Sequence, residues 1–315
     1  MALKKRTSAK TSNVLNGASV GIPPRHIDFQ FPDTTPKYFY ADNATATTFF
    51  AMLSGFFPPG ERYFMDSVRY FRSHVTDTQQ RAAISGFMGQ EAIHGREHDR
   101  LNELLAERGF DMDTPDRFVK FGLRILKMLP KRTQLAATTF MEHFTALLAE
   151  QLLEDETFQS LADPEMIKIW QWHALEELEH KSVAYNVYEI IGNSHGERIA
   201  ATAASLVVLL PMLGITWAWM LAKDGKLGSV KDNAIGLNVL FGPKGFVSGI
   251  MRRLPEFVDR RYHPDNHDTR ALEDTWRQRL FAENGSLYRA YRNRPDSDQV
   301  KICLLYTSPS PRDRG

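Results

Sequence analysis

Apolar residues recur at three- and four-residue spacing through most of the chain, and no segment alternates apolar and polar positions as a strand does. The pattern therefore predicts an all-α protein. Pro58 and Pro59, followed by Gly60, predict an interruption near the start, because proline removes a backbone donor. We expect Glu61 to open a new helix there. The expected helices cover residues 44–57, 61–74, 78–108, 118–128, 131–154, 164–191, 197–222 and 271–284.

The pattern divides the 315 residues into four parts. Residues 1–24 are rich in Ser, Thr, Lys and Asn and are expected to form a disordered tail. Residues 25–196 are expected to form the helical bundle that carries the chemistry, and residues 197–300 an apolar helix with a helical extension. Residues 301–315 include the stretch from Cys303 to Asp313, which resembles translated sequencing-adapter sequence. We expect this end to be non-native and leave it out of the fold.

Charge and cysteine content exclude several classes of protein and several types of metal site. The 39 Lys and Arg residues balance 38 Asp and Glu residues, for a formal charge of +1, which disfavours a nucleic-acid binder. A single cysteine excludes a disulfide framework or a cysteine-based metal cluster, so any metal must be held by His and carboxylate. No apolar run follows the basic residues near the start, so we expect no signal peptide and a cytoplasmic protein.

Two segments carry a Glu-x-x-His motif. Positions i and i+3 lie about 60° apart on a helix, so Glu91 and His94 point the same way, as do Glu177 and His180. His173 precedes Glu177 by four residues and shares its face. Each segment therefore presents at least one carboxylate and one imidazole on one side of a helix.

Two further predicted helices each place one acid among apolar residues, Glu61 and Glu142. The order Glu, Glu-x-x-His, Glu, Glu-x-x-His on four helices is the ligand plan of ferritin-like di-metal proteins. Four buried carboxylates need positive charge among them, which two divalent cations would supply, with Fe favoured over Mn or Zn. The alternatives are an ordinary first-turn acid for Glu61 and a surface role for Glu142. The predicted ligands are Glu61, Glu91, His94, Glu142, His173, Glu177 and His180.

Several neighbouring residues allow more than one role. His98 shares the face of its helix with the ligands and is an eighth ligand, a group that orients a ligand, or a surface group in an ion pair. His143 is expected to orient a ligand or to be structural. Glu176 and Glu179 are candidates for orienting ligands or for moving protons, and an error of one residue in register would exchange Glu176 for Glu177.

Three segments carry a resemblance to a known family: residues 57–62 (FPPGER), 90–98 (QEAIHGREH) and 172–181 (WHALEELEHK). They resemble the bacterial family of predicted metal-dependent hydrolases, over about residues 25–276. The ligand set is also similar to that of the di-iron p-aminobenzoate N-oxygenases, in which a third His joins the usual six ligands. The resemblance implies a ferritin-like bundle that binds metal.

The chemistry implied by these residues leaves three classes of function open. The first is an oxygenase or oxidase in which two Fe(II) ions react with O2. Its electrons would come from a separate donor, because no nucleotide-binding motif is present, and its substrate would be a small molecule such as an amine or a lipid. Aromatic candidates for its substrate pocket, or for plain core, are Tyr63, Phe64, Phe140, Phe144 and Trp172.

The second class is a hydrolase in which a metal activates water and Glu176 or Glu179 moves its proton. An HD-type hydrolase would instead use the pairs His98-Asp99 and His267-Asp268. The third class is metal binding without catalysis.

Residues 199–222 contain no charged side chain and would form a helix of roughly 36 Å, long enough to span a bilayer. Arg198 and Lys223 flank this segment, and Trp217 and Trp219 lie near one end. The alternatives are a buried helix and a homodimer interface. If the helix over residues 199–222 contacts the inner membrane, the protein is cytoplasmic but associated with that membrane. The apolar residues 234–250 could then lie at the membrane beside this helix.

Overall fold

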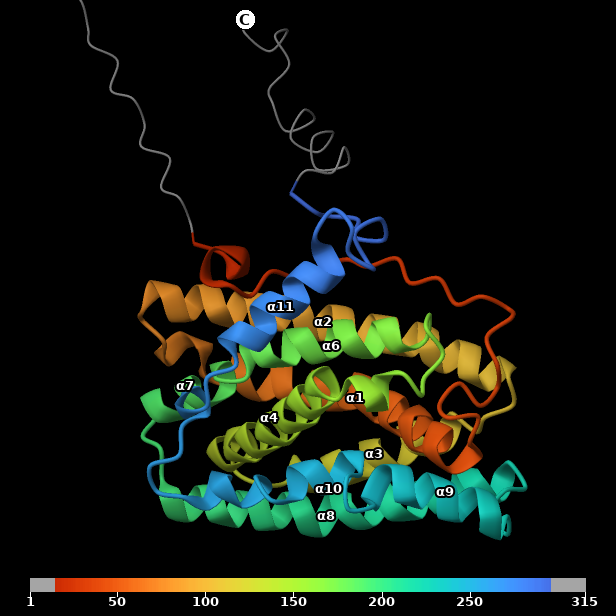
Figure 1. Ribbon diagram of the computed structural model, residues 1–315. Helices are drawn as coiled ribbons and strands as arrows, with labels where there is room; N and C mark the ends of the chain where they lie inside the picture. Colours follow the sequence, from red (N-terminus) through yellow and green to blue (C-terminus); the bar gives the residue numbers. More distant parts are fainter. Residues whose placement is uncertain (1–14, 296–315) are drawn as a thin grey trace, which may run out of the picture.

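The computed structural model describes residues 15–295 and consists of helices and connecting loops (Figure 1). No strand forms within the described residues; two isolated bridges join Ile27 to Tyr291 and Tyr40 to Ala162. The predicted all-α fold is therefore confirmed. The adapter-like stretch from Cys303 to Asp313 lies outside the described residues.

A stretch without helix, residues 21–43, separates the first element from the second, and the later elements follow one another closely. The elements are η1 (Gly17–Val20), α1 (Ala44–Phe71), η2 (Arg72–His74), α2 (Thr78–Glu107), α3 (Asp113–Leu126), α4 (Lys131–Glu154), α5 (Glu156–Gln159), α6 (Ile167–His180), α7 (Val183–Ile190), α8 (His195–Lys223), α9 (Val230–Phe241), α10 (Phe246–Met251), η3 (Leu254–Val258), η4 (Pro264–Asn266) and α11 (Arg270–Phe281).

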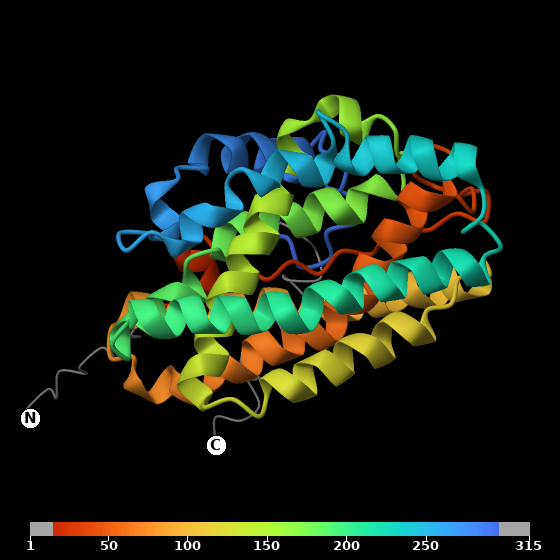
Figure 2. The same ribbon diagram turned by 90° about the horizontal axis from the view of Figure 1, so that it is seen from below.

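Helices α1, α2, α4 and α6 form the central bundle, in which α1 packs on α2 and α4 packs on α6. Helices α8, α9 and α10 form a layer along one side of it, against α1 and α4, while α11 covers α6 on the other side (Figures 1 and 2). The starts of the first two long helices are capped as their sequences suggest. Asn43 accepts a hydrogen bond from the backbone of Ala46, and Asp77 from that of Gln80.

The expected break at Pro58 and Pro59 is wrong, because both prolines lie inside the continuous helix α1. A proline at position i leaves the carbonyl at i−4 without its helical partner and crowds it. For Pro58 that carbonyl belongs to Ser54, and it accepts a hydrogen bond of 3.2 Å from Asn102 Nδ2 on α2. For Pro59 it belongs to Gly55, which has no side chain to add to the crowding. Tertiary packing thus replaces the missing bond.

Other differences from the expected elements are smaller. The expected helix over residues 164–191 is divided into α6 and α7 at Lys181 and Ser182, where Lys181 Nζ donates to the His267 carbonyl. Helices α9 and α10 form within the expected helical extension, at positions for which no helix bounds were predicted. The expected disordered tail included residues 15–24, yet Gly17 and Ile22 are buried against α2.

Two apolar stretches, His195–Lys223 and Val230–Val258, are long and apolar enough to cross a membrane, a test that the core helix of a soluble protein also passes. The first is α8. The second is divided among α9, α10 and η3, so it does not form one uninterrupted helix.

Candidate metal centre

The seven predicted ligands meet at the middle of the bundle. Helix α1 contributes Glu61, α2 contributes Glu91 and His94, α4 contributes Glu142, and α6 contributes the other three. None is more than 5 % exposed. A close contact between helices makes this possible: at Gly95 of α2 a Cβ would lie 3.0 Å from Glu61 Oε2. Glycine therefore lets α2 approach the carboxylate from α1.

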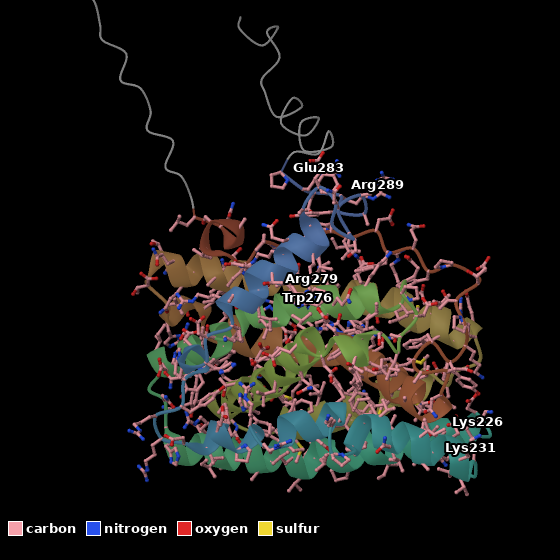
Figure 3. All side chains as sticks on the ribbon, in the orientation of Figure 1. Lys226, Lys231, Trp276, Arg279, Glu283 and Arg289 are labelled. Carbon is pink, nitrogen blue, oxygen red and sulfur yellow. The ribbon has the colours of Figure 1, made fainter. Side chains whose placement is uncertain are left out.

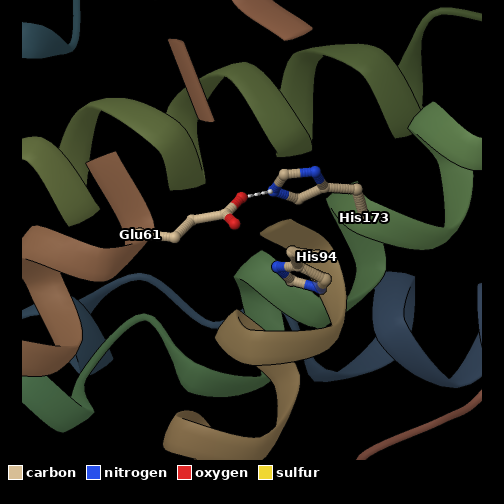
Figure 4. Close-up of side chains that lie close together, drawn as sticks. All are labelled: Glu61, His94 and His173. Atoms are coloured by element: carbon tan, nitrogen blue, oxygen red, sulfur yellow. Dashed lines mark ion pairs between the residues drawn. The ribbon is translucent and has the colours of Figure 1, made fainter. Parts of the chain in front are cut away.

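The ligand atoms form two groups. Glu61, His94 and His173 make the first (Figure 4), and Glu91, Glu177 and His180 make the second; within each group the atoms lie within 4.8 Å of one another. We call them the Glu61 group and the Glu91 group.

Glu177 joins the two groups. Its Oε1 lies 3.1 Å from His173 Nε2 and 3.6 Å from His94 Nδ1 in the Glu61 group, and 3.4 Å from His180 Nε2 in its own. Glu142 extends the Glu91 group, with its Oε2 at 3.7 Å from His180 Nε2.

The hydrogen bonds of these side chains show whether they suit a metal. Both carboxylate oxygens of Glu61 and Glu142, Oε2 of Glu91 and Nδ1 of His94 are buried without a hydrogen-bond partner. Glu91 Oε1 faces His180 Nε2 at 3.0 Å. An unpartnered buried charge is costly, at several kcal/mol each. Oxygen and imidazole nitrogen are the ligands of Fe, Mn and Zn, so the residues fit a pair of divalent cations.

Comparison with known proteins identifies the family of the chain. The model of a family described as predicted metal-dependent hydrolase matches residues 23–268, which include all seven predicted ligands. The chain belongs to this family. No curated protein and no solved structure matches the chain. Membership of the predicted metal-dependent hydrolase family indicates the class of protein, and the structure indicates which residues are candidates for metal binding.

Burial controls the protonation of the carboxylates in this hydrolase-family centre. Burial and the neighbouring acids Glu91 and Glu177 raise the pKa of Glu61 well above its usual value, and burial with Glu91 does the same for Glu142. Burial also raises the pKa of Glu91 to about 7. Burial opposes ionisation of Glu177 too, but the adjacent His180 lowers its pKa well below the usual value. Without metal, therefore, Glu177 carries charge most readily.

Two of the three candidate imidazoles are held by a hydrogen bond at the nitrogen that points away from the carboxylates. His94 Nε2 donates to Glu176 Oε2 at 3.0 Å, and His180 Nδ1 donates to Gln90 Oε1 at 3.0 Å. Such partners orient a ligating histidine and fix its tautomer. His94 Nδ1 and His180 Nε2 are therefore the nitrogens that face the carboxylates. Burial opposes protonation of His180, but Glu177 and Glu91 raise its pKa well above the usual value, so a metal bound at Nε2 would take the place of a proton.

A chain of hydrogen bonds fixes the third imidazole. The Ser54 hydroxyl donates to Asn102 Oδ1 and therefore accepts from His98 Nδ1 at 2.9 Å. His98 is neutral, because burial lowers its pKa, so its Nε2 accepts from His173 Nδ1 at 2.7 Å. His173 Nε2 then turns a lone pair toward the oxygen of Glu177 at 3.1 Å. Two acceptors that close together favour a cation between them.

The residues with several predicted roles now have defined positions. His98 is fully buried behind His173 and belongs to neither ligand group. His143 Nδ1 pairs with the Tyr262 hydroxyl, away from the ligands. Glu176 is held by Arg25 and Trp172 in addition to His94.

Glu179 is also fully engaged, and it lies outside both ligand groups. It accepts hydrogen bonds from Arg25, Arg277 and Gln90, with donor distances of 2.7 to 2.8 Å. Glu176 thus holds His94 directly, and Glu179 holds Gln90, which in turn holds His180.

Sequence reasoning missed Arg25, Gln90, Ser54 and Asn102. Gln90 directly precedes Glu91, so its place in the motif could have identified it. Arg25 lies in the segment before α1, and nothing in its local sequence indicates that it contacts Glu176 and Glu179, about 150 residues away.

The HD-type alternative finds no support in the described residues. Asp99 next to His98 is exposed, and its nearest cation is Arg62. His267 pairs with Glu150, and Asp268 pairs with Arg270 on the surface. Neither dipeptide belongs to the ligand groups.

Two of the candidate ligands, His173 and Glu177, line a small, mainly apolar cavity of about 40 Å³. It is lined by Phe50, Leu53, Phe57, Thr145, Leu148, Ala149, Leu152, Trp170, His173, Ala174, Glu177 and Phe246. The expected pocket aromatics are absent from this lining. Tyr63, Phe64 and Phe140 belong to the core, Phe144 packs against the core, and Trp172 packs edge-on against His94. They fill the bundle because their helical faces point away from the cavity.

Proposed function

We propose that the protein is an enzyme with a dinuclear metal centre, in which iron is the physiological metal and O2 oxidises an apolar substrate. The observation that carries the proposal is the position of Glu177 Oε1, within 3.6 Å of imidazole nitrogens from both ligand groups. One carboxylate in that position can serve two metal ions at once. The proposed ligands are the seven residues predicted from the sequence.

The charges of the centre support two divalent ions. Four carboxylates balance two such ions, and the three imidazoles add neutral nitrogen donors. Two ferrous ions bound there would supply electrons for the reduction of O2, and a separate donor would restore them. The protein's own contribution is to hold the donors rigidly in a dry site, through Glu176, Gln90 and His98.

The cavity supports an apolar substrate group. Its lining is aromatic and aliphatic apart from Thr145 and two of the proposed ligands, His173 and Glu177. Its volume of about 40 Å³ admits a methyl group or the end of a short alkyl chain, which would lie next to His173 and Glu177 without having to displace ordered polar partners. Binding in such a place excludes water from the reacting group.

Hydrolysis is the second candidate, favoured by the description of the family. In that reaction a metal-bound water attacks, and a nearby base takes its proton. Glu176 and Glu179 are both engaged with arginine, so neither is free for this task. In this alternative Glu142 would be the base and would not bind metal, which leaves six ligands; its two oxygens have no hydrogen-bond partner. Metal binding without catalysis is the third.

The test is anaerobic loading with Fe(II) followed by rapid mixing with O2. Oxygen consumption and absorbance are followed for the wild type, for Glu91→Ala and for Glu103→Ala, a control in which an exposed glutamate on the same helix is removed. We expect the wild type and the control to consume O2 with a transient absorbance change, and Glu91→Ala to lose both.

The competing result is equally specific. Iron-loaded protein that consumes no O2, together with ester or phosphoester cleavage by the zinc or manganese form that Glu142→Gln abolishes, would overturn the oxygenase and establish the hydrolase. Metal binding with neither activity would leave the non-catalytic function.

A further inference from the structure

Helix α8 has the reverse of the usual distribution of side chains. A helix on the surface of a soluble protein turns its apolar residues inward. On α8 the outward positions include Val207, Leu210 and Ile215, which are 74 %, 60 % and 55 % exposed. The buried positions are mostly small or polar, namely Arg198, Ala201, Thr202, Ser205, Thr216, Met220 and Leu221.

The inner side of α8 packs as helices pack in lipid. The hydroxyls of Thr202 and Ser205 donate back to carbonyls of their own helix, each at 2.9 Å. On α3, a Cβ at Gly122 would lie 2.7 Å from Met212 Sδ, so the two helices meet over a glycine. Small residues at helix contacts and hydroxyls bonded within the helix are typical of membrane environments.

The apolar surface extends onto the neighbouring helices. Phe121 on α3, which packs against α8, and Ile235, Leu237 and Phe241 on α9 are all large, apolar and exposed. Figure 2 shows that α3, α8 and α9 lie along the same side of the molecule. We call Phe121, Val207, Leu210, Ile215, Ile235, Leu237 and Phe241 the apolar face. An exposed apolar surface on this scale marks an interaction site.

The segment that comes after α8 in the chain is rich in positive charge. Between residues 223 and 261 the chain has eight cations, Lys223, Lys226, Lys231, Lys244, Arg252, Arg253, Arg260 and Arg261, and four acids, Asp224, Asp232, Glu256 and Asp259. Two of the acids are engaged elsewhere: Asp224 pairs with Lys37, and Asp232 accepts from the backbone at the start of α1. One of the cations, Arg253, pairs with Glu150, so seven cations and two acids are left. Lys226 and Lys231 lie near each other at one end of this layer (Figure 3). This charge complements anionic lipid headgroups.

We propose that the apolar face binds the surface of an anionic lipid bilayer, with α8 lying in the plane of the membrane rather than crossing it. Helix α8 is fixed to the protein along its length: Arg198 at its start bonds the Tyr185 hydroxyl and the Asp259 carbonyl, and Trp217 near its end donates to the Thr45 carbonyl. To span the bilayer it would have to break these contacts. The inference does not depend on the reaction proposed above.

The test is sedimentation of the purified full chain with vesicles, one set of phosphatidylcholine alone and one set containing about a third phosphatidylglycerol. The variant Val207→Glu/Leu210→Glu/Ile215→Glu is compared with the wild type. The matched control Tyr70→Glu/Leu161→Glu/Ile190→Glu adds the same charge at exposed apolar positions outside the apolar face. Circular dichroism checks that each variant is folded, which we expect because all six positions are exposed.

We expect the wild type and the control to sediment with anionic vesicles and less with neutral ones, and the apolar-face variant to partition at least about tenfold less. The proposal is overturned if the wild type stays in solution with both vesicles. It is also overturned if size-exclusion chromatography shows a dimer that the apolar-face variant dissociates while vesicles bind neither protein, because the face would then contact a second copy.

Discussion

His98 Nε2 accepts a hydrogen bond of 2.7 Å from His173 Nδ1, and this bond directs the other nitrogen of His173 toward Glu177. His98 itself belongs to neither ligand group. The position of one imidazole thus depends on a second imidazole behind it.

This relationship predicts a graded loss of metal affinity. His98→Ala should weaken metal binding by about 10- to 100-fold, because His173 loses the partner that orients it. His173→Ala should remove one metal ion altogether. Titration with Fe(II) under anaerobic conditions distinguishes the two variants, with the exposed His74→Ala as the control. Equal, complete loss of metal in His98→Ala would show that His98 is itself a ligand.

Gly95 predicts a steric effect on the Glu61 group. A methyl at this position would lie 3.0 Å from Glu61 Oε2, so Gly95→Ala should displace that carboxylate and lower the occupancy of its metal while the protein stays folded. Gly60→Ala is the matched control, because no atom lies within 4 Å of the added methyl. Metal analysis of both variants makes the comparison. Unchanged metal content in Gly95→Ala would contradict the assignment of Glu61 as a ligand.

Asn102 predicts a cost in stability. Asn102→Ala removes the donor to the Ser54 carbonyl, which Pro58 cannot replace, and should lower the free energy of unfolding by about 1 to 3 kcal/mol. Urea denaturation of the metal-free protein measures the difference, with Glu103→Ala as the neighbouring control. A change no larger than that of the control would mean that water satisfies this carbonyl.

The raised pKa of Glu91, about 7 because of burial, predicts a pH dependence of the metal-free protein. Between pH 4.5 and pH 7 the unfolded chain releases the Glu91 proton and the folded chain keeps it, so the wild type loses stability as the pH rises. Glu91→Gln cannot lose that proton. Its stability relative to the wild type should therefore increase by about 3 kcal/mol over this range, measured by denaturation at each pH. A constant difference would refute the raised pKa.

The meeting of the candidate ligands could be predicted because it depends on helical geometry. Glu91 with His94, and Glu177 with His180, share a face wherever the segments are helical, and the order of the acids along the chain restricts how four helices can combine. The continuous path of α1 through Pro58 could not be predicted. It depends on Asn102, which is 44 residues further along the chain than Pro58 and has no local signal for this role.

The residues that orient the candidate ligands also divide into those with a local sequence signal and those without one. Gln90 lies within a motif, so its role could have been predicted from the sequence. Arg25 contacts Glu176 only because the segment before α1 runs along the bundle, and periodicity carries no information about that path. The reversed face of α8 was hidden for a similar reason: a run without charges does not tell which of its sides is buried.

The measurement that tests the central claim most directly is the metal content of the wild type and of Glu177→Ala after anaerobic Fe(II) titration and gel filtration. Glu177 Oε1 lies 3.1 Å from His173 Nε2 and 3.4 Å from His180 Nε2, so its removal should affect both ligand groups. We expect two iron ions per chain in the wild type and less than one in Glu177→Ala, with circular dichroism unchanged. One ion per chain in the wild type, or two retained in Glu177→Ala, would contradict a dinuclear centre joined by Glu177.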